Sequence, residues 1–598
     1  MKKFLALIAI ALVVAAAVWV TLRIQIANQL AKVPELLPES TLLLAQASFP
    51  MRTRERWHQS DLYQIWREPS VQAWLQRPLA QLPKDQSSHQ TLEEFLQLGS
   101  NHLFLALTSL EKNEPVVIGG FHFETTEEKA RQFIAQREAN WWPKSSGAKH
   151  TTVVYEQHPI EVVAVGNLTY TSVYHNHWFF ASNDLATLKA LLDRTRRRGE
   201  QTSGSLEENP HFAAATKHLG SDYDALLYVD PQPFAQKLSL LLAMAEQPLA
   251  TAELERLKSV RSFATTFGFQ HGKMREVDFL EMPRAESKEK LTQPLLKAAT
   301  TDTFLYAVSE LHWPPNFLAP STGPAQGLMA WLRDFGQTLN SHGITADEIR
   351  ATFGEQAETS GIWTQDAHWP AFLAALPVKD PSRARKIADA LATMEVAGAG
   401  WTRTEENGST FYSAQILDGL LPLSLTMALN DRLFVLGLDQ GAVKAALTGA
   451  IPPNGLEKNK TFRDADALVP RGESAFNYVD TKLLYERLDP AIRPLLTMGA
   501  TLYPALSKTV DLAKFPPPEA ITRHLSPIVM SQRYENDGYV TESIGPVTFR
   551  QATAGIAAAI IGSLEYFHQG LKVPGLSASP ATSPPSTVAS PSPTPSPF

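Results

Sequence analysis

The middle of the chain carries one sequence pattern twice, and this repetition limits the folds that the chain can adopt. Leu206–Leu238 aligns without gaps with Leu456–Leu488, and ten of the 33 aligned positions are identical. Three shorter pairs of segments precede them in the same order, and the offset between paired segments varies from 250 to 262 residues along the chain. The pairs are Thr41–Ala45 with Thr303–Ala307, Lys129–Arg131 with Arg383–Arg385, and Trp178–Phe180 with Leu433–Val435. Similarity that recurs in order along a chain indicates a duplicated structural unit with loop insertions.

Each copy alternates short apolar runs with segments of helical periodicity. Leu103–Leu110 and Val116–Phe123 are typical strands, and Thr126–Glu138 has apolar residues at helical spacing. Asp537-Gly538, between two such runs, is typical of a hairpin turn. Tight turns between short strands predict antiparallel pairing. The predicted fold class is α+β, with two tandem, internally duplicated domains of antiparallel sheet carrying helices on one face, preceded by a transmembrane helix.

The predicted organisation has five parts, and the second copy carries a helix-rich insertion near Gly327–Asn340. The parts are a signal anchor (1–25), a first α+β repeat (36–285), a second α+β repeat (296–550), an apolar helix (551–572) and a disordered tail rich in Pro, Ser and Thr (573–598).

The amino terminus predicts a membrane anchor. Phe4–Leu22 is an apolar run of 19 residues between Lys3 and Arg23, and a helix of that length spans roughly 29 Å, close to the hydrocarbon thickness of a bilayer. The positive-inside tendency sends the chain after Arg23 out of the cytoplasm. The expected location is therefore the inner membrane, with a single span and a periplasmic body. Cleavage near Ala15–Ala17, giving a soluble periplasmic protein, is the alternative.

The carboxyl terminus has a different composition. Ser577–Phe598 contains seven Ser, seven Pro, three Thr and no charged residue, so it predicts an extended, disordered spacer. Ala552–Leu564 is apolar, but its 13 residues are too few to span a bilayer comfortably. A core or surface-docked helix is the preferred interpretation of that segment.

Composition and motifs exclude several classes of function. The net charge of −7 lacks the basic footprint of a nucleic-acid-binding protein. The absence of cysteine excludes disulfides, thiolate metal sites and cysteine nucleophiles. The signatures of nucleotide-binding loops, zinc proteases and serine hydrolases are absent. Serine–lysine patterns stand without a companion motif and are attributed to chance: Ser109 with Lys112, Ser146 with Lys149, and Ser287 with Lys290. The chain is therefore predicted not to be an enzyme and to use no cofactor.

Two pairs of polar residues are the best candidates for a site. His175 and His177 would share one face of a strand and could hold a metal ion, but two polar residues beside a turn are the simpler interpretation. Asp230 and Asp480 are matched between the copies, and each follows a strand and precedes a helical run. Helix capping accounts for both acids without catalysis.

Basic and aromatic clusters have comparable structural explanations. Arg194–Arg198 ends a helix, where cations are favoured, although it could also contact a lipid headgroup or polyanion. A second basic cluster is formed by Arg52, Arg54 and Arg56. The aromatic residues that follow could line a groove, but their spacing favours packing of a helix pair onto a sheet: Trp57, Tyr63, Trp66 and Trp74.

Two further parts of the sequence are distinctive: Arg56–Leu75, and Phe515–Pro527 together with Asp537-Gly538 and Glu542–Thr548. They resemble a family of large, membrane-anchored bacterial envelope proteins that is defined by a domain of unknown function. The likeness covers roughly residues 30 to 550. It implies export and a similar architecture, and it supplies no catalytic residues.

These observations predict a non-catalytic binding or structural module of the cell envelope. The two copies could form a pseudo-symmetric cleft that receives a partner. The expected partners are the membrane, through the N-terminal helix, and an envelope protein or ligand, but no nucleic acid. The alternatives are an envelope hydrolase without a recognisable motif and an assembly or chaperone-like factor.

Overall fold

The computed structural model describes most of the body of the protein. The described residues up to Thr548 form one compact unit, and residues 549–555, which are helical, belong to a second. The described residues are 32–81, 86–110, 115–141, 147–196, 204–237, 258–284, 291–313, 318, 328–395, 399–417, 423–449, 452–502 and 511–555.

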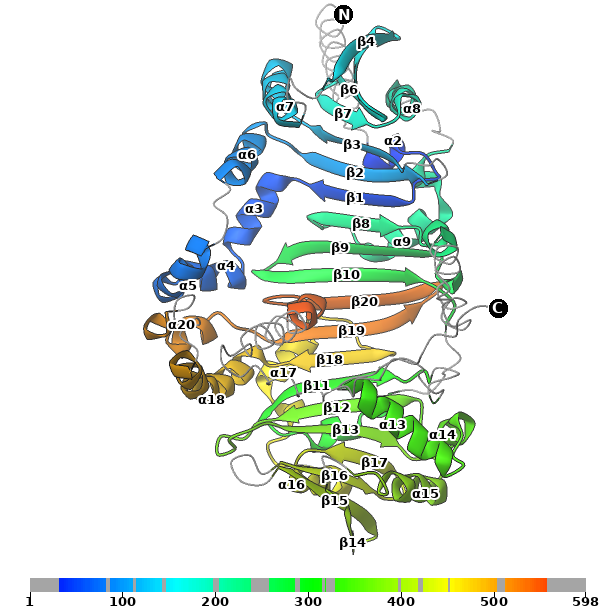
Figure 1. The fold of residues 1–598 in the computed structure, drawn as a ribbon, viewed down its shortest axis with the longest axis vertical. Coiled ribbons are helices and arrows are strands. Elements are labelled where there is room, and N and C mark those ends of the chain that lie inside the picture. The colour runs from blue at the N-terminus through cyan, green and yellow to red at the C-terminus, as the bar shows by residue number, and fades with distance from the viewer. Residues whose placement is uncertain are drawn as a thin grey trace, which may run out of the picture. The chain divides into compact units, whose positions relative to one another are not determined.

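Twenty strands form one antiparallel sheet (Figure 1). The strands of the first half are β1 (Leu43–Ser48), β2 (His102–Ser109), β3 (Val116–His122), β4 (Lys149–Tyr155), β5 (His158–Val165), β6 (Leu168–His175), β7 (Trp178–Ser182), β8 (Ala225–Val229), β9 (Ser262–Gln270) and β10 (Lys273–Glu281). Those of the second half are β11 (Thr303–Glu310), β12 (Gln356–Ile362), β13 (Ala371–Pro377), β14 (Thr402–Glu406), β15 (Ser409–Leu417), β16 (Leu423–Leu429), β17 (Leu433–Gly437), β18 (Ala475–Val479), β19 (Ile528–Glu535) and β20 (Gly538–Gly545).

Helices occupy the connections between the strands. In the first half they are α2 (Val33–Leu36), α3 (Pro50–His58), α4 (Asp61–Arg67), α5 (Pro69–Gln81), α6 (Gln86–Gln97), α7 (Glu127–Trp141), α8 (Leu185–Arg196) and α9 (Pro210–Leu219). In the second half they are α12 (Pro294–Ala298), α13 (Leu328–Ser341), α14 (Ala346–Thr352), α15 (Pro381–Leu391), α16 (Gln440–Thr448), α17 (Lys460–Asp466), α18 (Thr481–Leu502) and α20 (Pro518–Thr522).

The strand order of one half is repeated in reverse by the other. From one edge of the sheet to its centre the order is β4-β5-β6-β7-β3-β2-β1-β8-β9-β10. From the centre to the other edge it is β20-β19-β18-β11-β12-β13-β17-β16-β15-β14. Each strand from β1 to β10 therefore has a topological counterpart ten places later.

The register of pairing follows the same equivalence. Tyr228 in β8 lies opposite Leu44 in β1, and Tyr478 in β18 lies opposite Tyr306 in β11. At the centre, β10 pairs with β20, and Val277 lies opposite Glu542, each being the fifth residue of its own strand. Equivalent positions thus meet across the central pair, which is the arrangement of a local two-fold axis perpendicular to an antiparallel sheet.

One face of the sheet is covered by corresponding helices in both halves. In the first half α2, α8 and α9 pack on alternate strand residues that include Leu44, Phe104, Ile118 and Tyr228. In the second half α12, α16 and α17 pack on Tyr306, Ala375, Phe476 and Tyr478. The alternation of side chains along a strand directs these residues to one face and their neighbours to the other.

The opposite face also carries helices, which corrects the prediction that helices lie on one face only. In the first half α6 and α7 pack on Phe121 and Phe179. In the second half α13, α14 and α15 pack on Met427 and Phe434. Figure 1 shows α9 behind the sheet and α13 in front of it. Both faces acquire helices because the apolar strands have side chains to bury on each side.

The two predicted repeats are parts of one sheet rather than separate sheets. The predicted boundary near 285–296 falls between β10 and α12, but β10 pairs with β20 along eight residue positions. The predicted helix near Gly327–Asn340 is present as α13, but it is not an insertion, because α3–α6 occupy the equivalent connection between β1 and β2 in the first half.

Several predictions lie outside the described residues. These are the anchor Phe4–Leu22, the tail and most of Ala552–Leu564. Within the described ranges, no helix combines the length and apolar character needed to cross a membrane.

Candidate functional site

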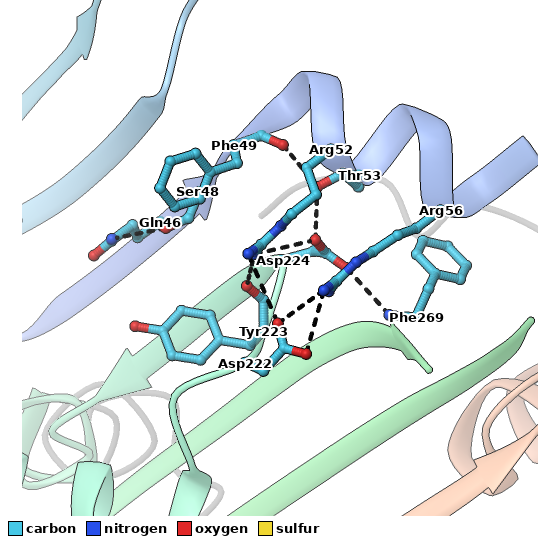
Figure 2. A network of polar contacts seen from close by, with 10 residues as sticks. All are labelled: Gln46, Ser48, Phe49, Arg52, Thr53, Arg56, Asp222, Tyr223, Asp224 and Phe269. Atoms are coloured by element: carbon cyan, nitrogen blue, oxygen red, sulfur yellow. Dashed lines mark hydrogen bonds and ion pairs between the residues drawn. The ribbon is translucent and has the colours of Figure 1, made fainter. Parts of the chain in front are cut away.

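The basic cluster of α3 forms a polar network with the segment that precedes β8 (Figure 2). The carboxylate of Asp224 is buried, with 1% of its side chain exposed, and it lies 3.6 Å from Arg52 Nη2 and 3.5 Å from Arg56 Nη1. It also accepts hydrogen bonds from the Thr53 hydroxyl at 3.0 Å and from the Phe269 backbone N–H at 3.1 Å. A buried acid thus fastens α3 to β8 and β9.

The rest of this network neutralises the arginines. Arg56 Nη2 donates to Asp222 at 3.0 Å, Arg52 Nη2 donates to the backbone carbonyl of Tyr223 at 2.9 Å, and Arg54 pairs with Glu93 at 3.0 Å. Because each of these cations faces an acid, the cluster is an intramolecular clamp. The sequence predicted the basic residues but not their partners, since the acids come from the distant α6 and β8 regions.

The two candidate metal-binding histidines do not share a face. His175 ends β6, and its ring packs on that of His158 with a centroid distance of 4.5 Å. His177 lies in the following turn with a φ of 62°, and its ring lies 5.6 Å from that of Phe123. Across the described ranges, no group of three His, Cys, Asp or Glu residues is placed to hold a metal ion. Two polar residues beside a turn remain the interpretation of this pair.

Two other histidines, His102 and His122, gather with His177 near Trp178 at one end of β2, β3 and β7. The rings of His102 and His122 lie 6.3 and 5.5 Å from the indole of Trp178, and His177 lies 6.4 Å from His122. Burial, followed by the neighbouring His102 and His177, lowers the pKa of His122 to about 4. His122 is therefore neutral at pH 7 and packs as an aromatic ring.

The matched acids Asp230 and Asp480 act as helix caps, as predicted. Asp230 accepts a hydrogen bond from the Gln232 N–H at 3.0 Å, and Asp480 accepts one from the Leu483 N–H at 2.9 Å. Each satisfies an amide at the start of a helix. The acids occupy equivalent places in the two halves.

The remaining candidate residues are dispersed. Trp57 packs on Phe269 of β9 at 6.0 Å, and Trp74 packs on Phe515 at 5.3 Å, whereas Trp66 is 40% exposed. The aromatic residues therefore attach α3 and α5 to their neighbours and do not line one groove. Arg194 lies in the last turn of α8, which ends at Arg196, and the residues after Arg196 lie outside the described ranges. Of the serine–lysine pairs, Lys112, Ser146, Ser287 and Lys290 also lie outside them.

Glu358 is a buried carboxylate in β12, only 1% exposed. It accepts hydrogen bonds from the Leu295 N–H at 2.8 Å, from Gln356 Nε2 at 3.0 Å and from the Tyr306 hydroxyl at 3.3 Å. Burial raises its pKa to about 7 despite these bonds. The carboxylate joins α12 to the sheet through these bonds. Because only 1% of Glu358 is exposed, a substrate cannot reach the carboxylate.

An apolar groove lies on the sheet face opposite α9, across β1, β2, β3, β7, β8 and β9. Its volume is about 660 Å³. Leu103 and Leu105 project into it and are 40% and 53% exposed. Leu227 and Phe267 contribute from β8 and β9. Among the described residues that line this first-repeat groove, none has an ionisable side chain.

A deep apolar pocket lies on the same sheet face in the second half, between the sheet and α13, α14 and α15. Its volume is about 310 Å³. Leu339, Ile349 and Ile387 form its buried end, and Thr359 and Ala374 lie at its exposed end. Glu358 also borders this pocket, but its carboxylate bonds to Leu295 and Tyr306, which belong to the opposite face.

Some of the residues that line the groove are equivalent, by position in the repeat, to residues that line the pocket. The pairing registers make Leu105 equivalent to Thr359 and Gly119 equivalent to Ala374. Both hollows therefore open on the same face of the sheet beside equivalent strands.

The sequence of β2 contains a signal for the first-repeat groove that none of the single motifs includes. Leu103–Leu107 is apolar at every position instead of alternating. A continuous apolar run places large side chains on both faces of a strand. One set is buried by α8 and α9, and the other set lines the groove.

Comparisons with known proteins give little further information. No family model matches the chain, and no curated protein matches it. Crystal form III of TP0453, from Treponema, is similar to part of the fold with a TM-score of 0.24 and 7% identity, over 45% of this chain and 85% of that one. Crystal form I of TP0453 gives a TM-score of 0.22 and 9% identity, over 44% and 82%. Likenesses at this level leave the function to be argued from the residues themselves.

Proposed function

We propose that this protein is a non-catalytic binding module of the bacterial cell envelope, built from two copies of one unit (36–285 and 296–550). Its N-terminal segment anchors it in the inner membrane and its body lies in the periplasm. Its first-repeat groove receives the apolar face of an amphipathic helix from a partner protein. The exposure of Leu103 and Leu105 on an apolar sheet face is the observation that carries the proposal.

The chemistry of the groove supports binding rather than catalysis. General acid–base and nucleophilic catalysis require a titratable or nucleophilic group beside the reacting atoms. The described lining offers aliphatic and aromatic side chains with the neutral Gln46 and Thr265. Glu358 and His122, whose pKa values are shifted by burial, lie outside that lining.

The backbone of the groove supports a helix as the occupant. Every strand that forms it is paired on both sides, so the backbone has no free edge to accept an added strand. Recognition must then use side chains on the sheet face. Elsewhere in this fold apolar sheet faces are covered by helices such as α9 and α17, and an amphipathic helix would complete the pattern.

The predicted tether supports a partner at the membrane. Val33 is buried in the core, and ten residues separate it from Leu22, the predicted end of the span. Ten extended residues reach about 35 Å. The resemblance of Arg56–Leu75 to membrane-anchored envelope proteins agrees with this location.

Photo-crosslinking in cells tests the proposed partner. A photoreactive residue at Leu105 should give one discrete protein adduct, whereas the same residue at Leu168, which is 59% exposed outside the groove, should not. A second change, Leu227→Asp, should reduce the Leu105 adduct roughly thirtyfold, because losing an apolar anchor costs about 2 kcal/mol. Absence of a protein adduct, or equal adducts at both positions, would reject the proposal.

A further inference from the structure

We infer that the pocket between the sheet and α13, α14 and α15 holds one unbranched alkyl chain, as supplied by a fatty acid or by the acyl chain of a lipid. This inference is independent of the first-repeat groove, because the two hollows are lined by different halves of the chain.

The lining determines the chemical class of the inserted group. Leu339 and Ile349 are 0% and 3% exposed, and Phe335 and Ile387 add apolar surface from α13 and α15. The carboxylate of Glu358 is engaged on the other side of the sheet by Leu295 and Tyr306. A charged or strongly polar group at the buried end would lose its hydration without receiving a hydrogen bond. The inserted part of the ligand is therefore a hydrocarbon.

The size and the opening favour a chain with a solvated head group. A cavity of about 150 Å³ accommodates one benzene ring, and this pocket has about twice that volume at 310 Å³. It passes from the buried Leu339 to the exposed Ala374 and Thr359. An amphiphile can insert its tail at this opening and leave its polar end in water. The apolar walls give affinity for the tail, and Glu358, the ionisable residue of the described lining, directs its carboxylate to Leu295 and Tyr306 rather than to a head group.

A chain-length series on the purified full-length protein tests the inference. Displacement of a fluorescent fatty acid by n-alkanoic acids should strengthen about fourfold for each added methylene until the pocket is filled. Lysophosphatidylcholines of equal chain length should bind within about threefold of the acids if the tail alone is recognised. Tight binding of one class only would identify the source of the chain, and it would overturn the statement that the head group is not recognised.

Two variants locate the binding. Ala374→Trp, at the exposed opening, should reduce affinity at least tenfold. Ala445→Trp, an exposed alanine on α16 in the same half, should leave affinity unchanged. Equal thermal melting of both variants would show that folding is preserved. No saturable binding by any chain length, or equal affinity in both variants, would overturn the inference. Because Leu227→Asp in the first-repeat groove should not alter this affinity, failure here is distinguishable from failure of the proposed partner site.

Discussion

Asp224→Ala is expected to lower the free energy of unfolding by about 3 kcal/mol, because it removes the buried acidic partner of Arg52 and Arg56 and leaves them the exposed Asp222, while Thr53 and the Phe269 N–H lose this acceptor. The carboxylate of Asp224 is 1% exposed and holds Arg52, Arg56, Thr53 and the Phe269 N–H. The partial exposure of the arginines keeps the value at the lower end of the range for buried pairs. Hydrogen exchange should also become faster in α3. Denaturation followed by circular dichroism measures the first effect, and peptide-resolved exchange measures the second.

Asp222→Ala is the matched control. Asp222 pairs with Arg52 and Arg56 as well, but 67% of its side chain is exposed. Exposed ion pairs contribute about 0–1 kcal/mol. Equal losses in the two variants would show that the burial of Asp224 does not account for the stability of the clamp.

Glu358→Gln is expected to stabilise the protein at alkaline pH. Burial raises the pKa of Glu358 from 4.5 to about 7, so between these values the folded state keeps a proton that the unfolded state has released. Stability therefore falls as the pH rises through this window. The full difference of about 2.5 pKa units corresponds to about 3 kcal/mol at pH 8. Glutamine cannot ionise, so the variant should match the wild type near pH 4.5 and exceed its stability by about 3 kcal/mol at pH 8.

Denaturant titrations at several pH values measure this difference. Glu355→Gln, in the same region but partly exposed, is the control and should leave the pH dependence of the wild type in place. Parallel stability curves for the wild type and Glu358→Gln would contradict a buried carboxyl group whose pKa is raised to about 7. A lower stability of Glu358→Gln at pH 8 would contradict it as well.

Local sequence patterns predict much of the fold. The predicted strand Val116–Phe123 is β3 (Val116–His122), and Asp537-Gly538 stands at the turn between β19 and β20. These elements depend on alternation, turn chemistry and helical spacing within a few residues. The pairing that joins the two halves does not depend on such local patterns, because β10 and β20 lie more than 250 residues apart in the sequence. Pairing between β10 and β20, the last strands of the two repeats, gives hydrogen-bond partners to two strand edges that would otherwise be unpaired. No local sequence pattern encodes this pairing.

The candidate site is less accessible to sequence reasoning than the fold. Arg52 and Arg56 are visible as a basic cluster, but Asp224 joins them only through the placement of β8 beside β1. The histidine pair fails as a shared ligand set because His177 falls in a turn rather than on the strand. The groove depends on which apolar residues the helices leave uncovered. Leu105 and Phe104 are equally apolar neighbours, yet Leu105 is 53% exposed and Phe104 is 2% exposed.

Thiol labelling in the cysteine-free chain gives the most direct test of the claim that the first-repeat groove is a binding surface. The chain contains no cysteine, so a single Leu105→Cys variant reports on the groove alone, and Leu168→Cys reports on an exposed leucine outside it. In the purified protein a maleimide should label both variants rapidly. In intact cell envelopes position 105 should be labelled at least tenfold more slowly while position 168 remains unchanged. Equal labelling of position 105 in both preparations would mean that nothing occupies the groove, and the proposed function would be wrong.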